Sequence, residues 1–182
     1  MIQKKGAATI ADLYRVPEKA ELINGEIVIM SPASIGHGRT AGIIYTSLLA
    51  YEKRRKEGVA VPDNVGFICD LPHRQSFSPD AAYFFGPFKD DEFVDGAPAF
   101  AAEVRSPEDF GPAAEAELAA KRADYFAAGT QVVWDVDPFR EKVVRVYRAD
   151  QPDRPAVYGA GDVAEAEPAL LGWRLAVSDL FR

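Results

Sequence analysis

Two acidic residues lie in stretches that are otherwise small, aromatic or apolar, where side chains are usually buried. Asp80 opens the run "PDAAYFF", and Glu103 lies inside the run "AFAAEVR". If these runs form neighbouring strands, the two carboxylates can converge at one edge of a sheet. Converging carboxylates repel each other unless a cation lies between them or a pKa rises. Oxygen ligands of this kind suit Mg²⁺, which can activate water and stabilise the charge that develops on a phosphodiester.

A basic residue near the two acids would complete such a site, and the sequence offers three. Arg105 shares a strand face with Glu103, because side chains alternate along a strand. Lys121 and Arg122 both border the apolar stripe of a helix that we expect over 113–128. Periodicity does not choose between Lys121 and Arg122, because either side chain could extend to solvent.

The elements that would position these residues mix helix and strand patterns. Residues 9–16 predict a short helix with Thr9 as its N-cap, and "AELINGEIVIM" predicts a hairpin with a two-residue Asn-Gly turn. In that register Glu21 faces Val28 and Ile23 faces Glu26, so all four share one face of the ribbon. Helices are expected over 40–57 and 113–128, and the second should be buried through Leu118, Tyr125 and Phe126. The runs "QVVWDVD" and "KVVRVYR" are expected to form strands. This order predicts one α/β domain over 1–182, a mixed sheet flanked by helices with an N-terminal hairpin.

The composition limits the classes of protein to consider. Of the 182 residues, 48% are hydrophobic and 27% charged, enough for a packed core, and no apolar run is long enough to cross a membrane. The first five residues are followed by no hydrophobic stretch, so no signal peptide is expected. The single cysteine, Cys69, is interpreted as a buried structural thiol and suits a reducing cytoplasm. The net charge of −7 argues against a broad basic surface for nucleic acid. The basic run in "EKRRKEG" (52–58) is interpreted as a solvated helix end.

Several motifs, taken in order, resemble a known family. They are "ELINGEIVIMSPAS", "GHGR", "SPDAAYF", "FAAEVRSPE", "KRADYFAAGTQVVWDVDP" and "VYR". Together they resemble the Uma-two family of restriction-endonuclease-like proteins, which belongs to the PD-(D/E)XK nuclease superfamily. The similarity covers roughly residues 10–182. It implies a restriction-endonuclease-like fold, an active site that depends on Mg²⁺ or Mn²⁺, and a nucleic acid substrate, with DNA expected and RNA left open.

The resemblance also implies roles for particular residues. Asp80 matches the Asp of the Pro-Asp motif and Glu103 the acid of the second motif, so both would hold the metal, with the main-chain carbonyl of Val104 as a third ligand. The superfamily usually carries a lysine two residues after the second acid. Here that position is Arg105, a departure, because arginine does not accept a proton at neutral pH.

The resemblance points instead to Lys121 as the third catalytic residue. Glu26 and His37 match further favoured positions and are candidate accessory residues, the first as a ligand through water and the second as a phosphate contact or proton relay. Each also has a structural interpretation, as a surface acid of the hairpin and a polar residue of the loop-to-helix junction.

Three alternatives to a nuclease stay open. In the first, Glu103 pairs with Arg105 or a helix cation for structural reasons, and nothing is catalysed. In the second, the chain is a non-catalytic binding or assembly module on the same fold. In the third, it is a metal-dependent hydrolase of a small phosphorylated molecule, which needs no basic surface. Cutting both strands of a duplex would favour a homodimer, with Phe88 and Phe93 as candidate contacts.

Overall fold

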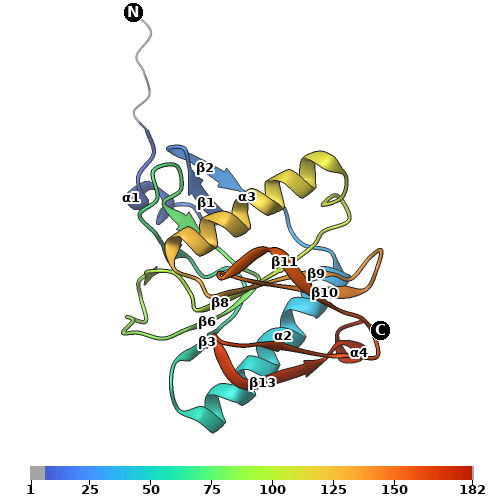
Figure 1. The fold of residues 1–182 in the computed structure, drawn as a ribbon. Helices are drawn as coiled ribbons and strands as arrows, with labels where there is room; N and C mark the ends of the chain where they lie inside the picture. Colours follow the sequence, from blue (N-terminus) through green and yellow to red (C-terminus); the bar gives the residue numbers. More distant parts are fainter. Residues whose placement is uncertain (1–6, 182) are drawn as a thin grey trace, which may run out of the picture.

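A six-stranded mixed sheet forms the centre of the computed structural model, which describes residues 7–181 (Figure 1). The first five residues, from which we expect no signal peptide, lie outside the described residues. The strand order is β11-β10-β9-β8-β6-β3, and only the β8–β9 pair is parallel within this sheet. The bounds are β3 (Val59–Val61), β6 (Ala81–Phe84), β8 (Phe100–Val104), β9 (Val132–Asp137), β10 (Val143–Arg148) and β11 (Gln151–Tyr158). The expected strands therefore form the predicted mixed sheet.

The two long helices, α2 (Ile35–Arg55) and α3 (Pro112–Ala128), cover opposite faces of this sheet (Figure 1). Helix α2 packs on the face that carries Trp134, and α3 packs on the other face through Tyr125. Helix α2 begins five residues before the predicted residue 40, because the Ser34 side chain caps it by accepting from the His37 N–H. Helix α3 matches its predicted range to within one residue.

The buried stripe predicted for α3 is only partly confirmed. Tyr125 is fully buried and stacks on Phe77 with ring centroids 4.1 Å apart, and Phe126 packs against the same cluster while staying partly exposed. Leu118 is half-buried instead of enclosed. Near the centre of the helix, Lys121 and Arg122 instead pair with Glu103 and Asp135 of the sheet.

The N-terminal hairpin has the predicted two-residue turn. Strands β1 (Ala20–Ile23) and β2 (Glu26–Ile29) pair in the expected register, and Asn24 and Gly25 both have positive φ, as a type I′ turn requires. The short helix α1 (Ile10–Leu13) precedes it with the expected Thr9 cap. Smaller sheets pair β5 (Ser76–Phe77) and β7 (Val94–Asp95) with β4 (Phe67–Ile68), and β12 (Val163–Ala166) with β13 (Leu170–Ala176) before α4 (Val177–Leu180).

Two predictions made from composition can also be compared with the structure. Cys69 is a free, buried thiol, and burial raises its pKa to about 11, which fits the structural interpretation. Among the helices of residues 7–181, none combines the length and the apolar character that crossing a membrane requires.

Candidate active site

Asp80, directly before β6, lies opposite Glu103 of the neighbouring antiparallel strand β8. Ala81 of β6 pairs with Ala102 of β8, and the Asp80 N–H donates to the Ala102 carbonyl at 3.1 Å. Continuing this register by one residue places Asp80 across from Glu103, where cross-strand side chains are direct neighbours. Both residues line one cleft, which has a volume of about 1060 Å³.

The Asp80 carboxylate is almost fully buried and is held by three donors. Its Oδ1 accepts from Lys19 Nζ at 2.7 Å and lies 3.3 Å from His37 Nε2, and its Oδ2 accepts from the Val104 N–H at 2.7 Å. Burial alone would raise its pKa, but His37 and Lys19 outweigh burial and hold the pKa of Asp80 below its ordinary value. Asp80 is therefore a carboxylate at neutral pH.

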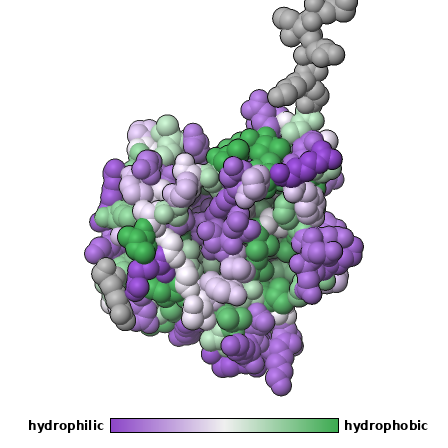
Figure 2. All heavy atoms as spheres, turned by 180° about the vertical axis from the view of Figure 1, so that it is seen from behind, coloured by the Kyte–Doolittle hydropathy of each residue, from purple (hydrophilic) through white to green (hydrophobic). Residues whose placement is uncertain are grey.

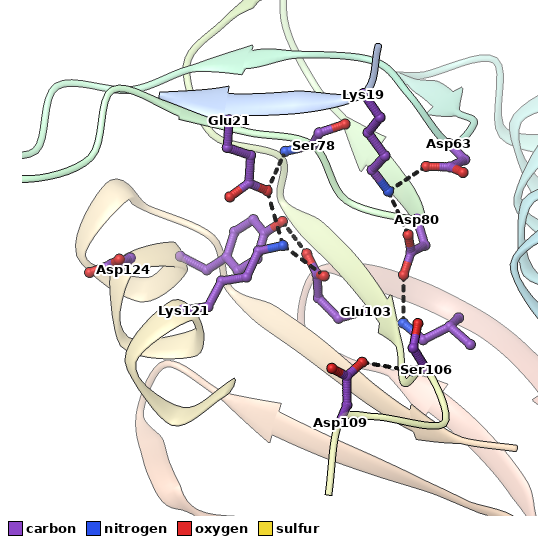
Figure 3. Close-up of polar contacts among 12 residues, drawn as sticks. Lys19, Glu21, Asp63, Ser78, Asp80, Glu103, Ser106, Asp109, Lys121 and Asp124 are labelled. Atoms are coloured by element: carbon purple, nitrogen blue, oxygen red, sulfur yellow. Dashed lines mark hydrogen bonds and ion pairs between the residues drawn. The ribbon is translucent and has the colours of Figure 1, made fainter. Parts of the chain in front are cut away.

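The Glu103 carboxylate has different neighbours on the α3 side of the sheet (Figure 3). Tyr125 Oη donates to Glu103 Oε1 at 2.6 Å, and Lys121 Nζ donates to Oε2 at 2.8 Å. Burial raises the pKa of Glu103, Lys121 partly offsets this, and the nearby charges of Asp80 and Glu21 raise it further. The two facing acids thus have pKa values that move in opposite directions.

Of the two candidate helix cations, Lys121 reaches Glu103 and Glu21, and Arg122 does not. The Lys121 ammonium lies 2.8 Å from Glu103 and 3.0 Å from Glu21. Burial would lower its pKa, but these two acids outweigh burial and raise it, so Lys121 is charged at neutral pH. Arg122 instead approaches Asp135 at 3.4 Å and stacks over the Tyr147 ring. Tertiary packing decides what helical periodicity left open.

Glu21 of β1 is a buried member of this cluster that the sequence did not single out. It is 2% exposed, and its carboxylate accepts from the Ser78 N–H at 3.0 Å and from Arg74 at 2.5 Å, besides pairing with Lys121. Burial opposes its charge, yet Lys121 and Arg74 hold the pKa of Glu21 below its ordinary value. The available signal was an acid between Ala20 and Leu22 in a strand, the same pattern that drew attention to Glu103.

Glu26, which was expected as an accessory residue, lies apart from the cleft in this structure. Glu26 is exposed at the turn end of β2 and does not line the cleft, although Glu21 and Glu26 were expected on one face of the hairpin. The hairpin does not lie free in solvent: Ile23 bridges to Arg74, and the Leu22 N–H donates to Ser76 Oγ. This contact buries the start of β1, so the hairpin's contribution to the cluster is Glu21.

Arg105 does not complete the site either. As expected it follows Glu103 on the same strand, but its guanidinium donates to both oxygens of Asp135 at 2.7 Å and to Glu115 of α3. Asp135 lies mid-strand in β9 and is buried. Asp137 does cap a turn, accepting from the N–H groups of 139–141.

The cleft walls are acidic more than basic. Lys19, Lys121 and His37 are its basic lining residues, whereas its acidic lining residues are Glu18, Asp63, Asp80, Glu103, Glu108 and Asp109. The basic run at 53–56 lies at the C-terminal end of α2, whereas His37 and the cleft lie at its N-terminal end, about 30 Å away for a helix of this length. The basic run is therefore not part of the lining of the cleft that holds the acids.

Comparisons with known proteins identify the family. Residues 10–178 match the model of the Uma2 family, described as "Putative restriction endonuclease". The chain belongs to this family. Its fold is similar to the crystal structure of "a putative nuclease belonging to DUF820" from Anabaena variabilis ATCC 29413, with a TM-score of 0.74 and 20% identity over 95% of this chain and 97% of that chain. A search of curated proteins found no match.

The donor set fits a divalent metal that keeps most of its water. Within residues 7–181, no group of three or more His, Cys, Asp or Glu side chains is arranged to hold a metal ion. Mg²⁺, however, is commonly bound through one or two carboxylates and several waters. Asp80 and Glu103 supply two carboxylates, and the Val104 N–H points at Asp80, so its carbonyl faces the same side of the strand.

Proposed function

We propose that this chain is a divalent-metal-dependent endonuclease that hydrolyses phosphodiester bonds in nucleic acid, with DNA as the substrate. The observation that carries the proposal is the pairing of two opposed carboxylates, Asp80 and Glu103, with a lysine ammonium 2.8 Å from the second acid. Family membership supports the reaction class, and the cleft of about 1060 Å³ can admit a phosphodiester.

Asp80 and Glu103 would hold Mg²⁺ or Mn²⁺, with the Val104 carbonyl as a third protein ligand. The bound metal would lower the pKa of a water molecule and offset negative charge on the phosphate. Asp80 is suited to this role because His37 and Lys19 hold its pKa below the ordinary value, whereas burial opposes the charge of Glu103 and raises its pKa. Tyr125 fixes one Glu103 oxygen through its hydroxyl and so orients the carboxylate.

Lys121 would act as a fixed positive charge and not as a proton acceptor. Its raised pKa keeps it charged at neutral pH, so it can position the attacking water and stabilise the pentavalent phosphate electrostatically. Glu21 would hold the ammonium in place through the 3.0 Å ion pair. His37, 3.3 Å from Asp80 and lining the cleft, would contact a phosphate oxygen.

The acidic cleft gives one alternative substrate a specific argument. DNA binding usually relies on basic side chains that neutralise many phosphates. Because six lining residues are acidic, a small phosphorylated molecule that presents a single phosphate to the metal is the second candidate substrate. Arg105 no longer favours the non-catalytic alternative, because it pairs with Asp135 and Glu115 and Lys121 lies beside Glu103 instead. The Lys121–Glu103 pair by itself is equally expected if the cleft is not catalytic.

Two further expectations belong to the proposal. The chain would act in the cytoplasm as a homodimer, so that both strands of a duplex can be cut. Phe88 is half exposed and available for such a contact, whereas Phe93 already stacks on Tyr14 with centroids 4.0 Å apart. On the face that Figure 2 shows, hydrophobic residues occur in separate groups among hydrophilic ones, so a dimer contact there would be mixed in character.

The test is cleavage of defined substrates by the purified chain. Single- and double-stranded DNA, RNA and a small phosphodiester would be incubated with Mg²⁺, Mn²⁺ or a chelator, alongside Asp80→Asn and Glu103→Gln. Cleavage of DNA that needs the metal and both acids supports the proposal. Turnover of the small phosphodiester alone would favour the second candidate, and inactivity with every substrate and metal would favour a non-catalytic role.

A further inference from the structure

Lys19 places an ammonium directly on the acid that the proposed metal would need. The residue lies just before β1, where the Met30 N–H donates to its carbonyl at 2.9 Å and so fixes its backbone. Its side chain is 18% exposed and reaches into the cleft, with Nζ 2.7 Å from Asp80 Oδ1 and 2.6 Å from Asp63 Oδ1 (Figure 3). Lys19 therefore links the hairpin to the sheet through Asp80.

The hydrogen-bonding capacity of Asp80 makes this contact a competitor for a metal. A carboxylate oxygen has two lone pairs, and Oδ1 already faces both Lys19 and His37, while Oδ2 accepts from Val104. A cation that binds Oδ1 must replace one of these donors. Lys19 is the donor that it would displace, because its ammonium repels a second cation on the same oxygen and its side chain is 18% exposed, against 9% for His37.

The structure also offers Lys19 a second carboxylate. Asp63 follows β3 in a loop, and its side chain is 43% exposed, against 5% for Asp80. Lys19 could leave Asp80 and keep its ion pair with Asp63 while its ammonium turns toward the open cleft. Lys121 lacks such freedom, because neither of its acids is well exposed: the side chain of Glu21 is 2% exposed and that of Glu103 is 16% exposed.

We infer that Lys19 is the resident counter-ion of Asp80 and that the divalent metal displaces the Lys19 side chain toward Asp63. There the Lys19 ammonium can contact the phosphate of an incoming substrate. The inference rests on the proposed function and adds a regulation of the same site: in the absence of substrate the lysine weakens metal binding. Substrate phosphate gives the displaced ammonium a new partner. Metal and phosphate should therefore bind cooperatively.

The experiment measures Mn²⁺ binding by isothermal titration calorimetry, without nucleic acid and without any activity readout. Lys19→Gln removes the charge but keeps a donor for Asp80, so the fold should survive, with circular dichroism as the check. Lys19→Arg retains the charge. Lys89→Gln is the charge-matched control, because Lys89 is exposed and pairs only with Glu92 among the described residues.

Lys19→Gln should bind Mn²⁺ about tenfold more tightly than the wild type, since like charges brought together cost at least that much. Lys19→Arg and Lys89→Gln should stay within about twofold. Asp63→Asn should weaken Mn²⁺ binding when Lys19 is present and have a smaller effect in the Lys19→Gln background, because Asp63 acts through the lysine.

The outcomes separate this inference from the proposed function. Equal Mn²⁺ affinity in the wild type and Lys19→Gln, with binding lost in Asp80→Asn, would overturn the inference and leave the metal site standing. Tighter binding in Lys19→Arg, or an equal effect of Asp63→Asn in both backgrounds, would also overturn it. If neither the wild type nor Lys19→Gln binds Mn²⁺, the metal site itself fails, and the proposed function fails with it.

Discussion

Replacing Lys121 by methionine removes the cation that, among residues 7–181, contacts both Glu103 and Glu21. Methionine keeps most of the side-chain volume, so the change is mainly one of charge. The ammonium lies 2.8 Å from the partly buried Glu103 and 3.0 Å from the buried Glu21, whereas Arg122 one residue later points to Asp135. The variant therefore tests the electrostatic role of Lys121 with little change to the shape of the cleft.

The expected loss of activity is larger than the expected loss of stability. Removing one preorganised donor to a transition-state charge costs about 10²–10³ in kcat, or roughly 2.7–4 kcal/mol. Breaking a buried ion pair can cost about 3–5 kcal/mol of folding free energy, but here both acids keep a partner. Glu103 keeps the Tyr125 hydroxyl and can take up a proton, and Glu21 keeps Arg74. We therefore expect a stability loss of only about 1–2 kcal/mol.

The assay is single-turnover cleavage of labelled DNA at saturating Mg²⁺, with urea denaturation followed by circular dichroism. Arg122→Met is the matched control, because it removes a cation from the same helix without touching the cleft acids. It should retain cleavage within about threefold. Full activity in Lys121→Met, or an equal loss in both variants, would refute the reasoning.

Four more outcomes follow from the structure. Leu118→Ala should cost about 1–2 kcal/mol in urea denaturation, below the range of about 2–5 for enclosed leucines, because Leu118 is half-buried; a larger cost would contradict its placement. Arg105→Met should lower the free energy of unfolding by about 3 kcal/mol, because among the described cations it leaves the buried Asp135 with the more distant Arg122. The folded variant should still cleave DNA. Burial opposes the charge of Asp137, but three N–H donors outweigh it and lower its pKa in the folded protein. The stabilisation from Asp137 is therefore present above pH 3.8 and is lost as the pH falls through the lowered folded pKa. Asp137→Asn should reduce this acid-dependent loss of stability in denaturation curves recorded across that pH range. Light scattering at micromolar concentration should give the mass of two chains, and a monomer mass would count against the dimer.

Local sequence signals predicted the elements well. The Asn24-Gly25 turn is set by two residues that tolerate positive φ, and the strong helix formers of 113–128 define α3 to within one residue. The strand patterns around Asp80 and Glu103 placed both acids on strands that are neighbours in the sheet. These features depend on short-range chemistry, which a single sequence carries.

The errors concern contacts between distant segments. Glu21 and Glu26 share a hairpin face in any isolated ribbon, and only the packing of the Arg74 segment buries the first and leaves the second exposed. Likewise Lys121 and Arg122 are neighbours on one helix, and their separate partners depend on how α3 lies across β8 and β9. Periodicity cannot report on such contacts, because it describes one element at a time.

The arginine at the usual lysine position therefore has a structural explanation. Arg105 is held by Asp135, whose strand β9 is parallel to β8, so it would not be free to serve Glu103. An ammonium stabilises charge by where it lies and not by which element carries it. Under the proposed function Lys121 would supply that ammonium from α3, where it pairs with Glu103 and with Glu21 of the hairpin. Arg105 on the strand pairs with Asp135, and Lys121 on the helix pairs with Glu103. An arginine at position 105 is therefore no argument against catalysis in this cleft.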